Sequence, residues 1–225
     1  VLEWVEGKTM ESLIEASTDS RDIEERFRQL GAILALMHNQ AADWQPPAGF
    51  TRHAVDADGL VGERPFWGPF WRSAALSAHQ QVKFAELRGR IHSLLSALPT
   101  SSNTYSLIHA DLHPGNVVVS DKRLHVIDFD DAGFGWHSYD LAVALKDYEA
   151  HPDFVSFQHA LVSGYRQARS LDDTSVALIP LFLVIRALVS VGWIDARPDL
   201  GYSDYPIGLI DYVNTHAEKV VAAFE

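Results

Sequence analysis

The sequence predicts an α+β domain that is mostly helical, with a small β insert near its middle. Two observations carry this prediction. Long segments on both sides of residue 100 place apolar side chains at helical spacing, whereas residues 105–128 hold short runs of β-branched and apolar residues. The 225 residues are 47% hydrophobic and 21% charged, an ordinary composition for a globular protein that can bury a sizeable core.

The first half of the chain alternates between helix and irregular structure. Residues 1–7 are expected to be extended. Helices are expected over 21–42 and over 79–98, and Pro99 stops the second one. Between them, residues 44–75 are rich in Pro, Gly and Trp, which predicts a long irregular connection.

The second half begins with the β insert and then returns to helix. The stretches "YSLIH", "NVVV" and "LHVID" are expected to be strands, with "SDKR" as a hairpin turn. Two helices are expected between Ser138 and Tyr165, and two more over 176–194 and 204–224. The segment 176–194 is nearly long enough to span a bilayer. Arg186 at its centre would be costly in lipid, so a buried core helix is expected.

Charge and composition exclude several classes of protein. The net charge of −12 argues against a nucleic-acid partner. The chain has no Cys, which excludes disulfides and thiolate chemistry. Its first residues, "VLEWVEGKTM", are neither a signal peptide nor a transit peptide, and they lack an initiator Met. We therefore expect a piece of a longer cytoplasmic protein that does not bind a membrane.

Polar residues gather in "LIHADLHPGNVVV" and "LHVIDFDDAG". A zinc hydrolase is one interpretation, because His109, Asp111 and His113 alternate and would share one face of a strand. The Pro-Gly pair that follows breaks such a strand, and no further His-rich motif appears. A polar loop with satisfied side chains is a second interpretation, but it must explain Asp111, Asn116 and Asp128 separately.

Phosphoryl transfer explains the same residues together. It needs a carboxylate that accepts the proton of the acceptor hydroxyl, and oxygen ligands for Mg²⁺. Asp111 and Asn116 stand five residues apart across a tight loop and can supply the base and one ligand. A strand, a turn and a second strand then bring Asp128 beside Asn116. The pattern favours an enzyme that uses ATP and Mg²⁺ to phosphorylate a hydroxyl group.

The motifs "HADLHPGN", "VIDFDDAG" and "SYDLA" resemble the superfamily of aminoglycoside phosphotransferases, choline kinases and type II homoserine kinases. This superfamily is the small-molecule branch of the protein-kinase-like fold. The resemblance covers essentially the whole chain as the C-terminal lobe of that fold. Residues 1–7 would be a remnant of the hinge, and residues 8–225 would be the lobe with the catalytic loop on a small β-hairpin insert.

The resemblance implies a role for each residue of the cluster. Asp111 would be the catalytic base, with Asn116 and Asp128 on Mg²⁺. His109 would brace the catalytic loop, and Asp140 would hold that loop through backbone hydrogen bonds.

The opening "LEWVEG" resembles the hinge that binds adenine. On that resemblance the backbone C=O of Glu3 and the N–H of Val5 would meet the adenine edge. Val118 and Ile127 would form the adenine floor, although plain strand packing explains these two equally well.

Two parts of a working kinase have no counterpart in this sequence, namely a glycine-rich loop before the hinge and a strand Lys for the phosphates. We therefore expect the N-terminal lobe to be absent and this piece alone to be inactive. "HAD" replaces the "HRD" of protein kinases, and the short interval from Asp128 to Asp140 leaves no room for an activation loop, which favours a small acceptor. A stress-response-type protein Ser/Thr kinase and a non-catalytic pseudokinase are the alternatives.

The acceptor site is the least determined part. The candidate residues are Asp130, Trp67, Trp136 and Arg186. Arg186 on an apolar helix needs an anionic partner, which is either an internal carboxylate such as Asp140 or Asp147, or the carboxylate of an amino-acid alcohol. Acidic and aromatic walls would instead suit an aminoalcohol or aminoglycoside-like cation. Asp130 could also approach a second metal ion or remain solvated.

Overall fold

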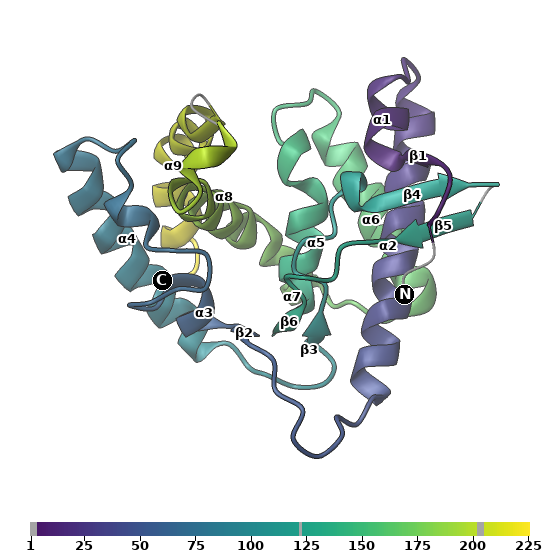
Figure 1. Ribbon diagram of the computed structural model, residues 1–225, viewed down its shortest axis with the longest axis horizontal. Helices are drawn as coiled ribbons and strands as arrows, with labels where there is room; N and C mark the ends of the chain where they lie inside the picture. Colours follow the sequence, from purple (N-terminus) through teal and green to yellow (C-terminus); the bar gives the residue numbers. More distant parts are fainter. Residues whose placement is uncertain (1–3, 122, 202–204) are drawn as a thin grey trace.

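The computed structural model describes residues 4–121, 123–201 and 205–225, and it is mostly helical, as the sequence predicts (Figure 1). The helices are α1 (Met10–Glu15), α2 (Ser20–Asp43), α3 (Ala57–Val61), α4 (Ala78–Ala97), α5 (His137–Leu145), α6 (Phe154–Ala168), α7 (Asp173–Ala177), α8 (Ile179–Asp195) and α9 (Tyr205–Ala222). The strands are β1 (Lys8–Thr9), β2 (Ala54–Val55), β3 (Tyr105–Ile108), β4 (Val117–Ser120), β5 (Arg123–Val126) and β6 (Gly133–Trp136).

The sequence missed the short elements. Helix α1 has six residues, too few to show periodicity, and begins where the side chain of Thr9 caps the N–H of Ser12. The connection 44–75 contains β2, α3 and a 3₁₀ turn. Strand β6 is "GFGW", whose glycines argue against a strand. Gly133 has a packing reason, because a Cβ there would lie 2.9 Å from the backbone carbonyl oxygen of His53.

The strands form two small sheets, ordered β1-β4-β5 and β2-β6-β3. The predicted hairpin is present, since β4 and β5 pair antiparallel with Val117 opposite Val126. In the other sheet β3 and β6 pair antiparallel, with Ile108 opposite Gly133. The loop 109–116 joins β3 to β4, and the loop 127–132 joins β5 to β6. Both loops therefore cross from one sheet to the other at the same place, which brings the polar cluster together.

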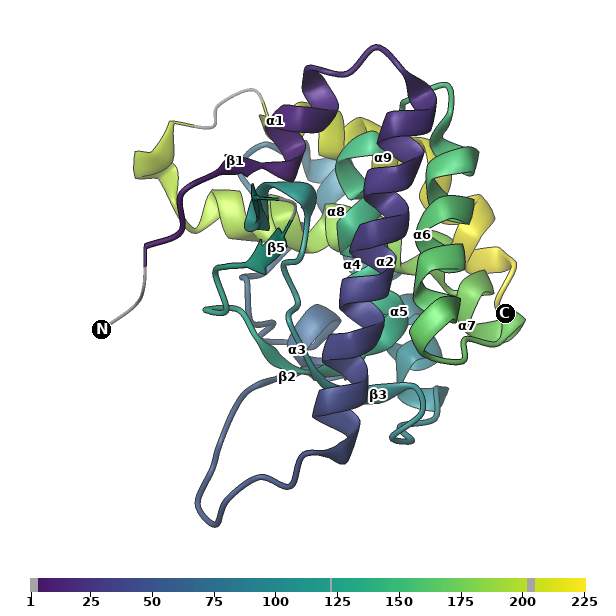
Figure 2. The same cartoon turned by 90° about the vertical axis from the view of Figure 1, so that its right-hand side faces the viewer.

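The β2-β6-β3 sheet lies between α3 and α2, whereas β4 and β5 extend toward the right-hand edge of the view (Figure 1). Helices α2 and α6 run side by side (Figure 2) and approach closely at two glycines. A Cβ on Gly164 would lie 1.9 Å from the carbonyl oxygen of Arg28, and one on Gly31 would lie 2.0 Å from that of Leu161. Every residue of α5 is buried.

Helix α8 lies against α5 and α9. By length and composition, the segment from Asp173 to Asp195 could span a bilayer, but 67% of its most apolar window is buried inside the fold. This agrees with the predicted core helix.

Candidate active site

One buried carboxylate holds the start of the loop 109–116 through backbone hydrogen bonds. Asp140, which is fully buried in the first turn of α5, accepts the backbone N–H of His109 at 3.0 Å and that of Ala110 at 2.7 Å. Its Oδ2 also contacts Nε2 of His38 on α2 at 3.1 Å. Ala110 has a φ of 67°, a left-handed conformation that a Cβ disfavours. The resemblance implied that Asp140 holds this loop through backbone hydrogen bonds, and the structure contains both bonds.

His109 connects this loop to the loop 127–132. Its Nδ1 accepts the backbone N–H of Asp111 at 3.3 Å, so the proton resides on Nε2, which donates to the carbonyl oxygen of Ile127 at 3.0 Å. The ring is 1% exposed and both nitrogens are engaged. His109 therefore cannot join Asp111 and His113 as a zinc ligand. No group of three or more potential His, Cys, Asp or Glu ligands occurs in the described part of the chain.

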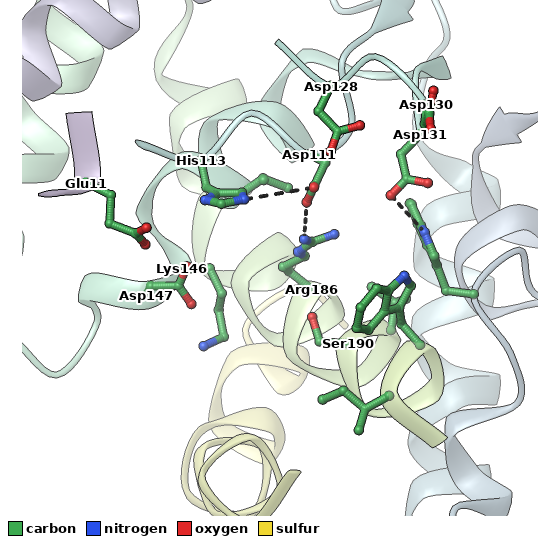
Figure 3. A pocket seen from close by; sticks show the side chains of 15 residues that line it. Glu11, Asp111, His113, Asp128, Asp130, Asp131, Lys146, Asp147, Arg186 and Ser190 are labelled. Atoms are coloured by element: carbon green, nitrogen blue, oxygen red, sulfur yellow. Dashed lines mark hydrogen bonds and ion pairs between the residues drawn. The ribbon is translucent and has the colours of Figure 1, made fainter. Parts of the chain in front are cut away.

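Asp111 directs its carboxylate into a pocket (Figure 3). Nδ2 of Asn116 donates to Oδ2 of Asp111 at 3.2 Å and to the Asp111 carbonyl oxygen at 2.9 Å. Nη2 of Arg186 donates to Oδ1. Nε2 of His113 lies 3.9 Å from Oδ2. The carboxylate is thus oriented from both sides by side chains of two elements.

Asn116 and Asp128 fit the donor set that Mg²⁺ prefers. The amide nitrogen of Asn116 is occupied by Asp111, which leaves its amide oxygen available as a ligand. Asp128 belongs to the lining of the same pocket and has a φ of 63°, which Asp tolerates better than most residues. One carboxylate and one amide oxygen, completed by phosphate and water, form a typical magnesium site.

The pocket has a volume of about 770 Å³ and is strongly acidic. Among its described lining residues, two carry a fixed positive charge, Lys146 and Arg186. Six carry carboxylates: Glu11, Asp111, Asp128, Asp130, Asp131 and Asp147. Lys146 pairs with Glu149.

Asp131 is the most perturbed of these acids. Burial, followed by the charge of Asp111, raises the pKa of its carboxyl, although the Nε1–H of Trp67 donates to it at 3.2 Å and opposes the shift. A positively charged group in the pocket would relieve this excess of negative charge.

The structure brings three of the four predicted acceptor-site residues to this pocket, namely Asp130, Trp67 and Arg186. Trp136 requires a correction. It is 4% exposed, its Nε1 donates to the carbonyl oxygen of Pro99 at 3.1 Å, and its ring packs against Tyr105 and Phe182. Its strand orientation points it into the core and not into the pocket. Arg186 does have an internal partner: it pairs with Asp111, where Asp140 or Asp147 was expected, and the charge of Asp147 also acts on it.

Sequence reasoning missed several lining residues, including His113, Lys146 and Ser190. A signal was present on α8, because Arg186, Ser190 and Trp193 recur at helical spacing and all line the pocket. For the other residues the sequence offers no comparable pattern, since they come from separate elements.

The predicted nucleotide side lies along β4. Glu3 is outside the described residues. Strand β1 pairs with β4, and a Cβ on Gly7 would lie 2.7 Å from Cγ1 of Val118, so only glycine lets the segment that carries Val5 approach so closely. Ile127 follows β5, donates its N–H to the carbonyl oxygen of Asn116 at 3.0 Å, and leaves 37% of its surface exposed.

The helical lobe, the two crossing loops and the acidic pocket define a protein of the kinase-like phosphotransferase class. Residues 1–176 match the model of the phosphotransferase enzyme family, and the chain belongs to this family.

Curated relatives and solved structures of small-molecule kinases are similar to the chain. It is 30% identical to the amicoumacin kinase of Bacillus subtilis over 79% of this chain and 53% of that protein. It is 34% identical to the homoserine kinase of Rhodospirillum rubrum over 68% of this chain and 46% of that protein. The solved structure of a microcompartment-associated aminopropanol kinase is 30% identical, with a TM-score of 0.76 over 89% of this chain and 63% of that one. The chain thus spans about half the length of the curated relatives it matches.

Proposed function

We propose that this chain is the catalytic-loop and acceptor-binding part of an ATP-dependent O-phosphotransferase that phosphorylates a hydroxyl of a small molecule. One observation carries the proposal. The carboxylate of Asp111, the free amide oxygen of Asn116 and the carboxylate of Asp128 belong to two adjacent loops beside one pocket. Base, metal ligands and acceptor space are therefore within reach of each other, as phosphoryl transfer requires.

The residues of the chain would divide the work. Asp111 would accept the hydroxyl proton, held in place by Asn116 and Arg186. Asn116 and Asp128 would hold Mg²⁺, which supplies positive charge against the phosphates. His109 and Asp140 would keep the two loops in register through the hydrogen bonds described above.

The acceptor is proposed to carry a cationic amine beside its hydroxyl, as an aminoalcohol or an aminoglycoside-like compound does. The excess of carboxylates in the pocket supports this class, because an ammonium group would offset their negative charge. The raised pKa of Asp131 supports it too, because a nearby ammonium group would stabilise the ionised carboxylate. Trp67 lines the same pocket and directs its Nε1–H at Asp131, so it adds an aromatic wall beside this carboxylate. The similarity to an aminopropanol kinase points the same way. An amino-acid alcohol such as homoserine is the second candidate, since Arg186 could bind its carboxylate.

Calorimetry on the longest native form of the protein tests the nucleotide site. We expect ATP to bind in the presence of Mg²⁺, and Asp128→Ala to abolish the Mg²⁺-dependent part of the affinity. Asp211→Ala is the matched control, because Asp211 is an exposed carboxylate on α9 outside the pocket lining. We expect residues 1–225 alone to bind ATP more weakly than the longer chain.

An acceptor screen then separates the remaining candidates. Phosphorylation of aminoalcohols, lost in Asp111→Asn, would support the proposal. Phosphorylation of protein Ser or Thr, with no small acceptor, would favour the protein-kinase alternative. Absence of Mg²⁺-dependent ATP binding in the wild type would contradict the enzyme and leave a pseudokinase binding module.

A further inference from the structure

Arg186 stands near the middle of the most apolar helix of the fold. Its neighbours Ile185 and Ala187 are fully buried, and 18% of its own side chain is exposed, on the side of the pocket. An arginine in such a place costs desolvation free energy unless an anion offsets it. Because Arg186 lines the pocket, its position points to a role within the pocket.

The anion that Arg186 contacts is the proposed base. Its Nη2 donates to Oδ1 of Asp111, and Figure 3 marks this contact with a dashed line. A guanidinium has five N–H donors in one plane, and a carboxylate has about four acceptor positions. Both groups therefore keep capacity for a further partner while they remain in contact.

The position of Asp111 fixes where the reacting groups must lie. The acceptor hydroxyl has to sit within hydrogen-bond distance of its carboxylate, about 2.6–3.2 Å. The phosphorus under attack then lies about 3–3.5 Å from that hydroxyl oxygen. A guanidinium in direct contact with Asp111 is consequently adjacent to the equatorial oxygens of the incoming phosphoryl group.

The negative charge in the pocket favours a cation at this place. Six carboxylates line the pocket, and the transferred phosphoryl group brings further negative charge. The second fixed cation of the lining, Lys146, is paired with Glu149 and lies 5.1 Å above the ring of Tyr212. Arg186 is the described cation that contacts the base itself.

We propose that Arg186 is a catalytic residue that binds the transferred phosphoryl group while it orients Asp111. In the step, the acceptor oxygen forms a bond to the γ-phosphorus and its proton passes to Asp111. The bond from the γ-phosphorus to the bridging oxygen breaks, and its electron pair leaves with ADP. Arg186 donates N–H groups to the equatorial oxygens as their charge develops. This role rests on the proposed function of Asp111 as the base.

Substitution of Arg186 tests the role through turnover. We expect Arg186→Gln to lower kcat by about 10³-fold, at the lower end of the effect of an arginine that stabilises phosphoryl transfer. Arg186→Lys should recover part of the loss, because a point charge replaces the planar donors. The control is Arg26→Gln, since Arg26 on α2 also pairs with an Asp, at 3.2 Å, and its side chain is 20% exposed. Free guanidinium ion should partly restore the activity of Arg186→Ala, which a purely structural role would not allow.

Binding of a phosphoryl mimic tests the role without turnover. The full-length protein is titrated with ADP and Mg²⁺ in the presence and absence of aluminium fluoride, which imitates the planar phosphoryl group. We expect aluminium fluoride to tighten binding in the wild type and in Arg26→Gln, and to have little effect in Arg186→Gln, while ADP and Mg²⁺ alone bind equally to all three. The Lys variant serves as the test protein if Arg186→Gln does not fold.

The outcomes separate the two proposals. Equal tightening in wild type and Arg186→Gln, or a kcat within about threefold of wild type, overturns the role of Arg186 and leaves the proposed function intact. A loss confined to the KM of acceptors with a carboxylate also overturns it and assigns Arg186 to acceptor binding. Absence of Mg²⁺-dependent nucleotide binding in the wild type overturns both.

Discussion

At the scale of single residues, a buried polar network holds the loop 109–116. His38 joins the hydroxyl of Tyr165 at 2.9 Å to the carboxylate of Asp140. The ring of His137 stacks on that of His38 at a centroid distance of 4.2 Å. Nδ1 of His137 donates to the carbonyl oxygen of Asn103, which leaves Nε2 as an acceptor for Ser106. Burial, together with His38 and Arg169, lowers the pKa of His137 to about 2.

This network makes the protein sensitive to acid. A histidine of the unfolded chain titrates near pH 6.5, so below that pH the unfolded state binds a proton that folded His137 refuses. Its contribution to stability is present above pH 6.5 and falls by about 1.4 kcal/mol per pH unit as the pH drops toward 2. We measure the free energy of unfolding in urea at pH 7 and at pH 5. Over this interval we expect it to fall by about 2 kcal/mol less in His137→Gln than in the wild type. Exposed His159→Gln should follow the wild type, and parallel curves for all three proteins would refute the prediction.

At the scale of elements, the close contact between α2 and α6 depends on glycine. At Gly31 and at Gly164, the backbone of the other helix occupies the space that a side chain would need. Ala is the better helix former, so propensity alone would favour replacing either glycine. Packing against the other helix therefore decides whether such a substitution stabilises or destabilises the protein.

Two alanine substitutions should move stability in opposite directions. Gly164→Ala forces its Cβ toward the backbone of Arg28 and should lower the free energy of unfolding by about 1–3 kcal/mol. Gly89→Ala in α4 meets nothing within 4 Å and should raise it by about 0.5–1 kcal/mol. Chemical denaturation of both variants measures this, and a stabilised Gly164→Ala would show that the helices can separate without cost.

At the scale of the whole molecule, the pocket is assembled from parts that are far apart in sequence. Glu11 comes from α1, Asp111 and Asp131 from the two crossing loops, and Arg186 from α8. Helix α8 packs against both α5 and α9, so the pocket wall and the core share one element.

A cavity in α8 should therefore lower the free energy of unfolding of the whole domain, which we expect to unfold in one transition. Leu188 is fully buried, and Leu188→Ala should cost about 2–5 kcal/mol of unfolding free energy through the lost contacts and the cavity. Val155→Ala on α6 is the control, because Val155 is 63% exposed and should change stability by less than about 0.5 kcal/mol. A thermal melt with one transition at lower temperature is the expected result. A small effect of Leu188→Ala would mean that α8 does not form part of a single cooperative core.

The predictable part of the site was the part encoded by local spacing. Asp111 and Asn116 occupy one short loop, and a hairpin of known length separates them from Asp128, so the sequence places them together. Trp136 illustrates the opposite case. An aromatic residue after the loop 127–132 suggested a pocket wall, but the pairing of β6 with β3 places it in the core.

The sequence by itself determined the helical class, the long helices, the hairpin and the three polar residues of the loops, because periodicity and short-range spacing express these directly. The tertiary structure decided which side chains from distant elements share the pocket. The contact between Arg186 and Asp111 joins residues 75 positions apart. No local pattern encodes such a contact, since it depends on how α8 packs against α5 and on where the two sheets place their connecting loops.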